Sequence, residues 1–512
     1  MTLFDKKKFV LTNSQSGKRE EFKPQKSPSV TFYSCGPTVY GPLHIGNARA
    51  LITADLLYRW LNHIGYQTNF VRNYTDVDDK IIHRSLEEKI SSLEVANKYI
   101  EYCEYDMKLL GLKPPVKTIR VTESMDDIFS LIKKIIDRKH AYVVPTNENG
   151  FEVFFSIDSF KTYGKLSGRN VEELQAGARI DIDENKKNPL DFSLWKPAKK
   201  NEPFWESPWG KGRPGWHIEC SAMAGKWLGE TIDLHHGGQD LIFPHHENEI
   251  AQSESANGKI FCRHWVHNAF VTMGKDKMSK SLGNIITIRK FIEDYGAEVM
   301  KYMYFSHHYR SSVEMTVGLL LKVCDELERI YTLKKWAGDT MSLNVSTEKT
   351  NDAYEILVGK AASVWEQMET EMFSDLNSPG ALGHLFTFIR DLNRTETIAT
   401  SKSGNGTAQT AARKTVAQEV YELLQDKLFS ISALFAEYPD SMLLHINQLR
   451  GKISSSSNAA KYTDDEIKKL IMERKSARDT KNFARADEIR KELDSNGILL
   501  VDSPSGTVWK FK

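Results

Sequence analysis

Cysteine is scarce in this chain: five occur among 512 residues, widely separated from one another. An odd number of scattered cysteines does not make a disulfide framework and favours reduced thiols or metal ligands. The five are Cys35, Cys103, Cys220, Cys262 and Cys324. Any cysteine chemistry in this protein is therefore expected to use free or metal-bound thiols.

Long apolar runs are missing as well. No stretch approaches the ~20 apolar residues that a membrane-spanning helix needs, and the first residues lack the apolar core of a signal peptide. We therefore expect no membrane segment and a cytoplasmic location.

The chain has almost no net charge. Lys and Arg total 69, Asp and Glu total 68, and the formal net charge is +1. The whole molecule therefore does not attract a polyanion, and any RNA binding must come from local patches. At 512 residues the chain exceeds one hydrophobic core, so about two to four domains are expected, with no internal repeat among them.

The first clear pattern is a βαβ unit. Residues 30–33 are rich in β formers, 48–65 have helical spacing, and 68–72 favour a strand again. This alternation predicts a parallel sheet that binds its ligands at the carboxyl ends of the strands. Cys35, His44 and Thr75 all fall at that edge.

Residues 120–215 interrupt this unit, with a helical pattern over 128–136 followed by aromatic strands, and they are interpreted as an insertion. The sheet pattern resumes over 216–278, which places Cys220, like Cys35, at a strand end.

The C-terminal part is predicted to be helical. Residues 319–436 have the spacing of a helix bundle, with polar loops predicted over 337–351 and 400–410. A Gly-Ser-rich flexible linker is predicted over 451–458. Thr463 and Glu466 form a capping box ahead of two helices and a hairpin.

The loop after the first strand carries a thiol, two Gly-Pro steps and the tetrad His44-Ile45-Gly46-Asn47, and a helix follows it. A helix start at a sheet edge directs backbone N–H groups and the positive end of the helix dipole at its ligand, which suits a phosphate. It is not a Walker A loop, because no Gly-Lys-Ser or Gly-Lys-Thr follows. Alone, such a tetrad more often marks a buried histidine beside a helix start.

A second motif changes this interpretation. Residues 277–281 are Lys-Met-Ser-Lys-Ser, and together with the tetrad they resemble the paired ATP-binding motifs of class I aminoacyl-tRNA synthetases. Residues 213–220 (Arg-Pro-Gly-Trp-His-Ile-Glu-Cys) and 243–249 (Phe-Pro-His-His-Glu-Asn-Glu) resemble the cysteinyl-tRNA synthetase family. The resemblance covers most of the chain from about residue 30 onward.

This resemblance implies an α/β fold with a split Rossmann-like parallel-sheet catalytic domain. It places the two catalytic halves at 1–119 and 216–318, the second including the region that contacts the tRNA stem, around an inserted connective peptide at 120–215. A helix bundle at 319–450 and a small α/β anticodon-binding module at 463–512 then complete the chain.

The resemblance also implies one Zn²⁺ held by Cys35, Cys220, His245 and Glu249. The residues themselves show less: Pro244 is expected to open a helix on which His245 and Glu249, at i and i+4, share a face. The pattern is not the His-Glu-x-x-His of metalloproteases. Taken alone, Cys220 is better interpreted as a small buried hydrophobe.

Four residues are implied to act on ATP, which Mg²⁺ accompanies. His44 and Asn47 would bond its phosphates, and Lys280 would add a mobile positive charge, with Lys277 in the same loop. The same resemblance places Thr75, Trp216 and Asp240 in the amino-acid pocket. Trp216 could otherwise be an ordinary core aromatic.

In the C-terminal module the resemblance implies anticodon contacts by Arg478, Phe483, Asp487 and Asp502. Arginine pairs with guanine edges, carboxylates accept from base amino groups and an aromatic ring stacks on bases. The alternative is that Phe483 belongs to the helix core and that the charges form a solvated face.

The function implied is activation of L-cysteine by ATP and transfer to tRNA(Cys) by a monomer. One alternative is the cysteine ligase of mycothiol synthesis, which resembles the same catalytic half but lacks a matching C-terminal module. Another is a non-catalytic RNA-binding paralogue. The presence of both ATP motifs and all four metal positions disfavours the paralogue.

Overall fold

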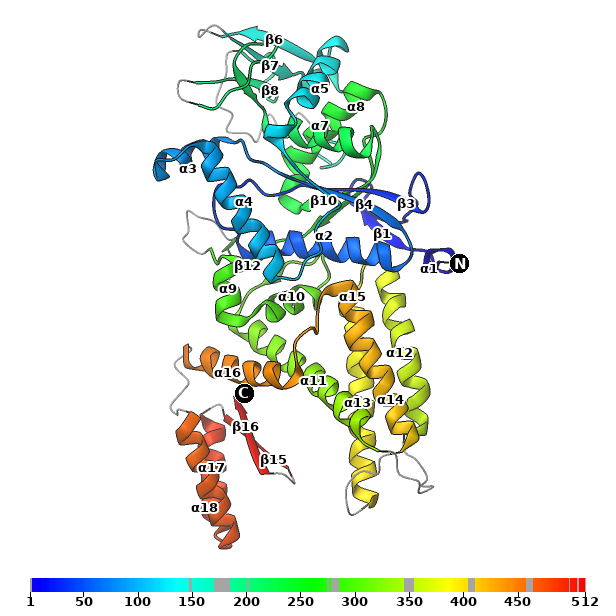
Figure 1. Ribbon diagram of the computed structural model, residues 1–512, viewed down its shortest axis with the longest axis vertical. Coiled ribbons are helices and arrows are strands. Elements are labelled where there is room, and N and C mark those ends of the chain that lie inside the picture. The colour runs from blue at the N-terminus through cyan, green and yellow to red at the C-terminus, as the bar shows by residue number, and fades with distance from the viewer. Residues whose placement is uncertain are drawn as a thin grey trace.

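The computed structural model describes most of the chain (Figure 1). The described residues are 2–146, 150–169, 185–199, 202–273, 276–277, 285–344, 354–403, 410–456, 464–496, 498–503 and 506–511. Lys280, Thr463 and Gly497 lie outside them.

A five-stranded parallel sheet lies at the centre, in the order β11-β10-β3-β4-β5. Its strands are β3 (Ser29–Ser34), β4 (Gln67–Tyr74), β5 (Lys117–Arg120), β10 (Ile232–Gly238) and β11 (Cys262–Asn268). The strand order runs outward in both directions from β3, and such a switch point is where open α/β sheets bind ligands. The α/β class and the predicted βαβ unit are both confirmed.

Helix α2 (Ile45–His63) connects β3 to β4. Most of its apolar side chains are buried in the core, and Leu57 and Trp60 are fully buried. The neighbouring elements of this half are α1 (Leu3–Lys6), β1 (Val10–Asn13), β2 (Lys18–Glu21), α3 (Asp79–Glu88) and α4 (Ser92–Leu109).

The insertion contains the predicted helix and strands, and the strands form an antiparallel sheet. The helix is α5 (Met125–Asp137), and the sheet, in the order β6-β7-β8-β9, contains β6 (Ala141–Pro145), β7 (Phe151–Phe155), β8 (Phe192–Pro197) and β9 (Gly212–Pro214). The insertion shares one apolar cluster with α7 (Trp216–Leu228) and α8 (Glu247–Asn257). In Figure 1 these elements lie together above the central sheet.

The chain after β11 crosses to the helical part through short elements. These are β12 (Val271–Met273), β13 (Asp276–Lys277), α9 (Ile288–Tyr295), α10 (Ala297–Phe305) and β14 (Val313–Glu314). The bundle then contains α11 (Val317–Ser342), α12 (Glu355–Phe373), α13 (Ser378–Ser403), α14 (Ala411–Glu422), α15 (Phe429–Ser432) and α16 (Pro439–Ser456).

Three predicted non-helical segments are wrong in part. Helix α11 continues to Ser342, because Ala337 and Thr340 are buried in the bundle. Helix α13 continues to Ser403. The serine-rich segment predicted as a linker is helical to Ser456, where buried Ile453 holds the end of α16 against the apolar core. In the ends of α11 and α16, tertiary contacts override composition.

The C-terminal module has the predicted two helices and hairpin. They are α17 (Asp464–Asp479), α18 (Phe483–Ser495), β15 (Ile498–Ser503) and β16 (Gly506–Phe511). A small separate cluster that includes Ile467, Ile489 and Leu500 forms its core. Among the described helices, none is both long enough and apolar enough to cross a membrane.

Candidate active site

A cleft of about 1520 Å³, open to solvent, lies at the carboxyl ends of β3, β4 and β10. Cys35, His44 and Thr75 line it, which confirms that they share this edge. The other predicted site residues that line it are Asn47, Trp216, Cys220, Asp240 and His245. Residues predicted from five separate stretches of sequence therefore share one cavity.

His44 is the N-cap of α2. Its Nδ1 accepts the Asn47 N–H at 3.2 Å, and the Asn47 side-chain oxygen accepts the His44 N–H at 3.1 Å. This reciprocal capping satisfies two N–H groups at the helix start. Because Gly46 and Asn47 line the cleft, the positive end of the α2 dipole lies at its wall and suits an anion.

The lysine loop lies between described segments. Lys277 ends β13 and pairs with Thr272 of β12. Where the described chain resumes, Ile45 N–H donates to Ile286 O at 3.0 Å, and Ile288 N–H donates to Leu43 O at 2.9 Å. The segment that follows the loop is therefore fastened directly beside His44.

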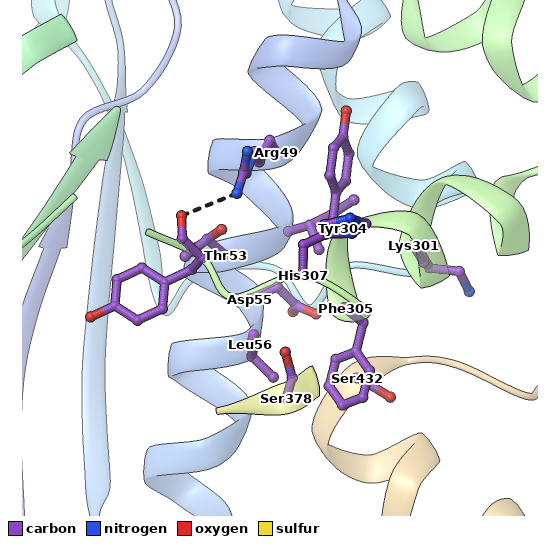
Figure 2. A pocket seen from close by; sticks show the side chains of 12 residues that line it. Arg49, Thr53, Asp55, Leu56, Lys301, Tyr304, Phe305, His307, Ser378 and Ser432 are labelled. Carbon is purple, nitrogen blue, oxygen red and sulfur yellow. Dashed lines mark hydrogen bonds between the residues drawn. The ribbon is translucent and has the colours of Figure 1, made fainter. Parts of the chain in front are cut away.

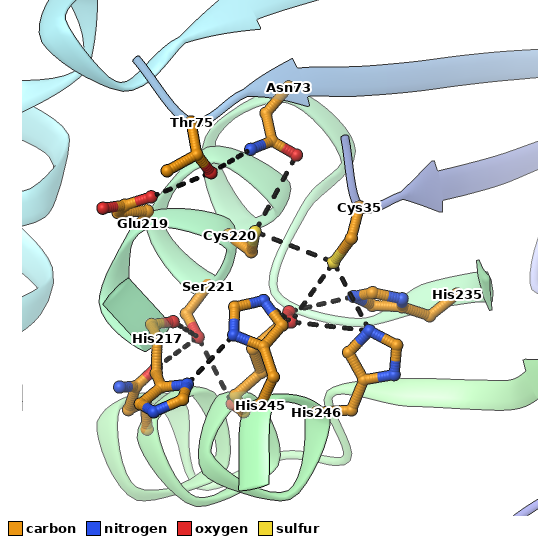
Figure 3. Close-up of polar contacts among 12 residues, drawn as sticks. Cys35, Asn73, Thr75, His217, Glu219, Cys220, Ser221, His235, His245 and His246 are labelled. Atoms are coloured by element: carbon orange, nitrogen blue, oxygen red, sulfur yellow. Dashed lines mark hydrogen bonds and ion pairs between the residues drawn. The ribbon is translucent and has the colours of Figure 1, made fainter. Parts of the chain in front are cut away.

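Two thiols, an imidazole and a carboxylate converge on one side of the cleft (Figure 3). The Sγ atoms of Cys35 and Cys220 are 3.7 Å apart, and Cys35 Sγ lies 3.5 Å from Glu249 Oε1. His245 Nε2 lies 3.1 Å from the same oxygen. The structure thus brings together the four residues that the resemblance assigns to a metal.

The spacing of these atoms fits a tetrahedral zinc. Around such an ion, two sulfurs lie about 3.8 Å apart, a sulfur and an oxygen about 3.6 Å, and a nitrogen and an oxygen about 3.4 Å. The corresponding distances here are 3.7, 3.5 and 3.1 Å. These three separations are within about 0.3 Å of the tetrahedral values, and all four donor atoms lie within 4.8 Å of one another.

Two further histidines adjoin the cluster and were missed by sequence reasoning. Cys35 and Glu249 form a second possible ligand set with His235 and His246. His246 Nε2 is 3.4 Å from Cys35 Sγ, and His235 Nε2 is 2.9 Å from Glu249 Oε2. The only sequence signal was the pair of adjacent histidines at each of 235–236 and 245–246.

The local structure around two of the ligands differs from the prediction. Cys220 lies inside α7 rather than at a strand end. Pro244 follows a cis peptide bond within the π-helical turn Ile242–His246, and the α-helix begins only at Glu247. His245 and Glu249 still share a face, because the turn runs directly into α8.

The cluster is a buried arrangement of opposite charges. Burial raises the pKa of Glu249, but His235 and His245 outweigh it and hold that pKa at about 2. Burial lowers the pKa of His245, yet Glu249 and Cys220 raise it to about 10. A hydrogen bond from the Cys35 thiol lowers the pKa of Cys220 to about 6. Anionic donors are thus already stabilised where a cation would bind.

The predicted amino-acid pocket adjoins these ligands. Trp216, the first residue of α7, is 39% exposed and stacks on His245 with ring centroids 4.4 Å apart, so it is not a core aromatic. Thr75 donates to Glu219 at 3.2 Å and accepts from Asn73 at 3.3 Å. Asp240 is exposed at the rim.

The predicted anticodon residues lie in the C-terminal module, apart from the cleft. Asp502 accepts two hydrogen bonds of 2.8 Å from Arg474, a residue that sequence reasoning missed, and Arg478 lies 3.5 Å from it. Asp487 is exposed on α18. Phe483 is 61% exposed, so the interpretation as helix core is wrong.

Comparison with solved structures defines the class of fold. The chain superposes on Mycobacterium tuberculosis methionyl-tRNA synthetase in complex with methionyl-adenylate with a TM-score of 0.61, 15% identity, and coverage of 81% of this chain and 93% of the other. For a putative arginyl-tRNA synthetase from Campylobacter jejuni the TM-score is 0.51, with 13% identity and coverage of 81% and 95%. The fold is that of a class I tRNA synthetase.

Comparison of sequences is more specific. Residues 21–325 match the family "tRNA synthetases class I (C) catalytic domain", and residues 367–427 match the DALR domain. Cysteine–tRNA ligase from Geobacter metallireducens is 43% identical over 98% of this chain and 99% of its own length. The Geobacter sulfurreducens protein of that name is 42% identical with the same coverage. The chain belongs to the cysteine–tRNA ligase family.

Proposed function

We propose that this protein is a cysteine–tRNA ligase that activates L-cysteine with ATP to cysteinyl-adenylate and transfers the cysteinyl group to tRNA(Cys). The observation that carries the proposal is the thiol, imidazole and carboxylate cluster in the same cleft as the His44–Asn47 helix end. A site that can bind sulfur, next to a helix end that can bind an anion, suits a thiol substrate and a nucleotide. Full-length similarity to cysteine–tRNA ligases supports it.

The first reaction needs no side-chain nucleophile, because the carboxylate of cysteine attacks the α-phosphate of ATP. Catalysis then consists of positioning and charge stabilisation. We assign the phosphate contacts to His44, Asn47, Lys277 and Lys280, with Mg²⁺ accompanying ATP. The segment that follows the lysine loop is hydrogen-bonded beside His44, through Ile286 and Ile288, and this supports the assignment.

We propose that the metal is one Zn²⁺ held by Cys35, Cys220, His245 and Glu249, since mixed thiolate, imidazole and carboxylate ligands suit zinc. When bound, zinc supplies a soft Lewis acid that prefers the thiol of cysteine to the hydroxyl of serine. Shape alone discriminates between such near-isosteres by only about 100-fold. We assign contacts with the rest of the amino acid to Thr75, Trp216 and Asp240, which line the same cleft.

We propose that the protein is a monomer. We also propose a cytoplasmic location. We propose the same domain division that the sequence analysis predicts. The mycothiol-pathway alternative has no use for the C-terminal module, and the similarity to cysteine–tRNA ligases extends over 98% of the chain.

The decisive experiment is cysteine-dependent exchange of pyrophosphate into ATP, followed by charging of tRNA(Cys). We expect exchange with cysteine, at least about 100-fold less with serine, and loss of exchange on chelation that added Zn²⁺ restores. Exchange without tRNA charging would favour the small-molecule ligase. No exchange with any amino acid would favour the non-catalytic paralogue.

The anticodon role is tested by Phe483→Ala. Because the ring is 61% exposed, its loss should not unfold the module, and kcat/KM for tRNA should fall by about 10-fold, the scale of one lost base stack. Pyrophosphate exchange should be unchanged. Met472→Ala is the matched control, since this side chain is 67% exposed on α17 of the same module. Equal charging by both variants and the wild type would contradict a stacking role.

A further inference from the structure

Helix α2 contains a buried guanidinium just beyond its cleft-lining first turn. Arg49 is 1% exposed. Gly46, Asn47 and Ala50 line the cleft, whereas Arg49 does not. Arg49 has no role in the proposed mechanism.

Arg49 bonds to Phe270 and to the turn 308–311, and Figure 2 shows one of these bonds beside a neighbouring pocket that Arg49 lines. Its Nη1 donates to Phe270 O at 2.7 Å, and Phe270 lines the cleft between β11 and β12. Its Nη2 donates to the carbonyl oxygens of the 308–311 turn: His308 at 3.3 Å, Tyr309 at 3.2 Å, and Ser311. One side chain therefore fastens the start of α2 to the strand that leads toward Lys277.

These bonds are not needed to satisfy most of the carbonyl groups. Phe270 O already accepts Val313 N–H at 3.0 Å, and Tyr309 O accepts Ala269 N–H at 2.9 Å. His308 O likewise accepts Ser311 N–H at 2.9 Å. Loss of the guanidinium would leave most of its acceptors with a backbone partner.

The charge of Arg49 has only a partial partner, the Tyr304 ring, whose centre lies 6.0 Å from the guanidinium. Among the described residues no carboxylate forms an ion pair with it, and burial lowers its pKa to about 10. Burying a cation without a counter-ion costs stability. The position is therefore poorly explained by folding alone, and it adds positive charge near the anion-binding end of α2.

We propose that Arg49 is a positioning residue for the nucleotide, which holds the cleft wall at Phe270 against the start of α2 and adds positive potential there. The inference rests on the proposed use of ATP. Arg49 does not line the cleft, so it acts through Phe270 and through its field.

The test is steady-state pyrophosphate exchange by Arg49→Met and Arg49→Lys. In Arg49→Met the KM for ATP should rise about 10-fold, the scale of a lost hydrogen bond from a charged donor. The KM for cysteine should change by less than about twofold, since Arg49 bonds to none of the residues proposed to contact cysteine. Arg49→Lys keeps the positive charge but lacks the planar set of N–H donors of the guanidinium. Its KM for ATP should therefore lie between those of the wild type and Arg49→Met.

Arg59→Met is the matched control. Arg59 is also buried in α2, but its Nε pairs with Asp55 at 2.6 Å, and its Nη2 donates to Gly111 O at 2.8 Å, away from the cleft. Its loss leaves a buried carboxylate without its cation, so its melting temperature should fall more than that of Arg49→Met. Its KM for ATP should stay at the wild-type value.

Arg49→Met is expected to change the KM for ATP more, and Arg59→Met is expected to lower the melting temperature more. This difference separates a positioning role from a stabilising role. An unchanged KM for ATP in Arg49→Met, an equal rise in the KM for both substrates, or an equal rise in Arg59→Met would overturn the inference. A wild-type protein without cysteine-dependent exchange would instead overturn the proposed function.

Discussion

Replacing Cys220 by serine should reduce kcat/KM for cysteine in pyrophosphate exchange by about 1,000-fold, the scale of losing several kcal/mol of metal-dependent stabilisation. Cys220 lies 3.7 Å from Cys35 inside a buried cluster. A serine hydroxyl is a harder and far more basic donor than a thiolate, and it does not replace the thiolate at a zinc site. Bound zinc should fall from one per chain to well below one.

Cys262→Ser is the control for this variant. Cys262 is also a buried cysteine, but its thiol donates to His264 O at 3.2 Å, a bond that serine can also make, and it belongs to neither possible ligand set. Zinc content and exchange should remain near wild type. A Cys220→Ser protein that kept its zinc and its preference for cysteine over serine would contradict the proposed metal site.

Lys280→Ala should lower the rate of cysteinyl-adenylate formation by about 100-fold or more, which is the scale of removing one preorganised charge donor from a transition state. Binding of cysteine should be largely unchanged, because the proposed metal ligands come from other elements. Lys280 lies outside the described residues, but the chain that follows its loop is hydrogen-bonded to Ile45 and Leu43. Single-turnover formation of cysteinyl-adenylate measures the effect directly.

Lys290→Ala is the control. This lysine is on the exposed side of α9, where it pairs with Asp294 at 3.0 Å, and surface pairs of this kind contribute little. Near-normal exchange by Lys280→Ala would show that the loop is only a surface turn. A comparable loss in Lys290→Ala would show that removing any lysine from this region disturbs the enzyme.

Much of the cleft could be predicted from the sequence because its signals are local. The strand at 29–34, the helix start at His44 and the i, i+4 relation of His245 to Glu249 each depend on a few neighbouring residues. Local composition failed where distant contacts decide the structure. The serine-rich end of α16 is helical because Ile453 packs into the bundle and Arg450 pairs with Glu328 at 2.7 Å.

The sequence by itself determined the chemical inventory: which thiols, histidines and carboxylates exist, and which short stretches form strands and helix ends. Only the tertiary structure decided which of them meet.

Cys35 and Cys220 are 185 residues apart (220 less 35), and no periodicity links them. They adjoin because β10 pairs in parallel with β3 and because α7 and α8 pack in the same apolar cluster. The same packing brings His235 and His246 to the cluster of thiols, imidazole and carboxylate. Separate long-range contacts bring Arg49 to Phe270. Long-range packing of this kind depends on the burial of whole faces, which residue spacing along the chain does not express.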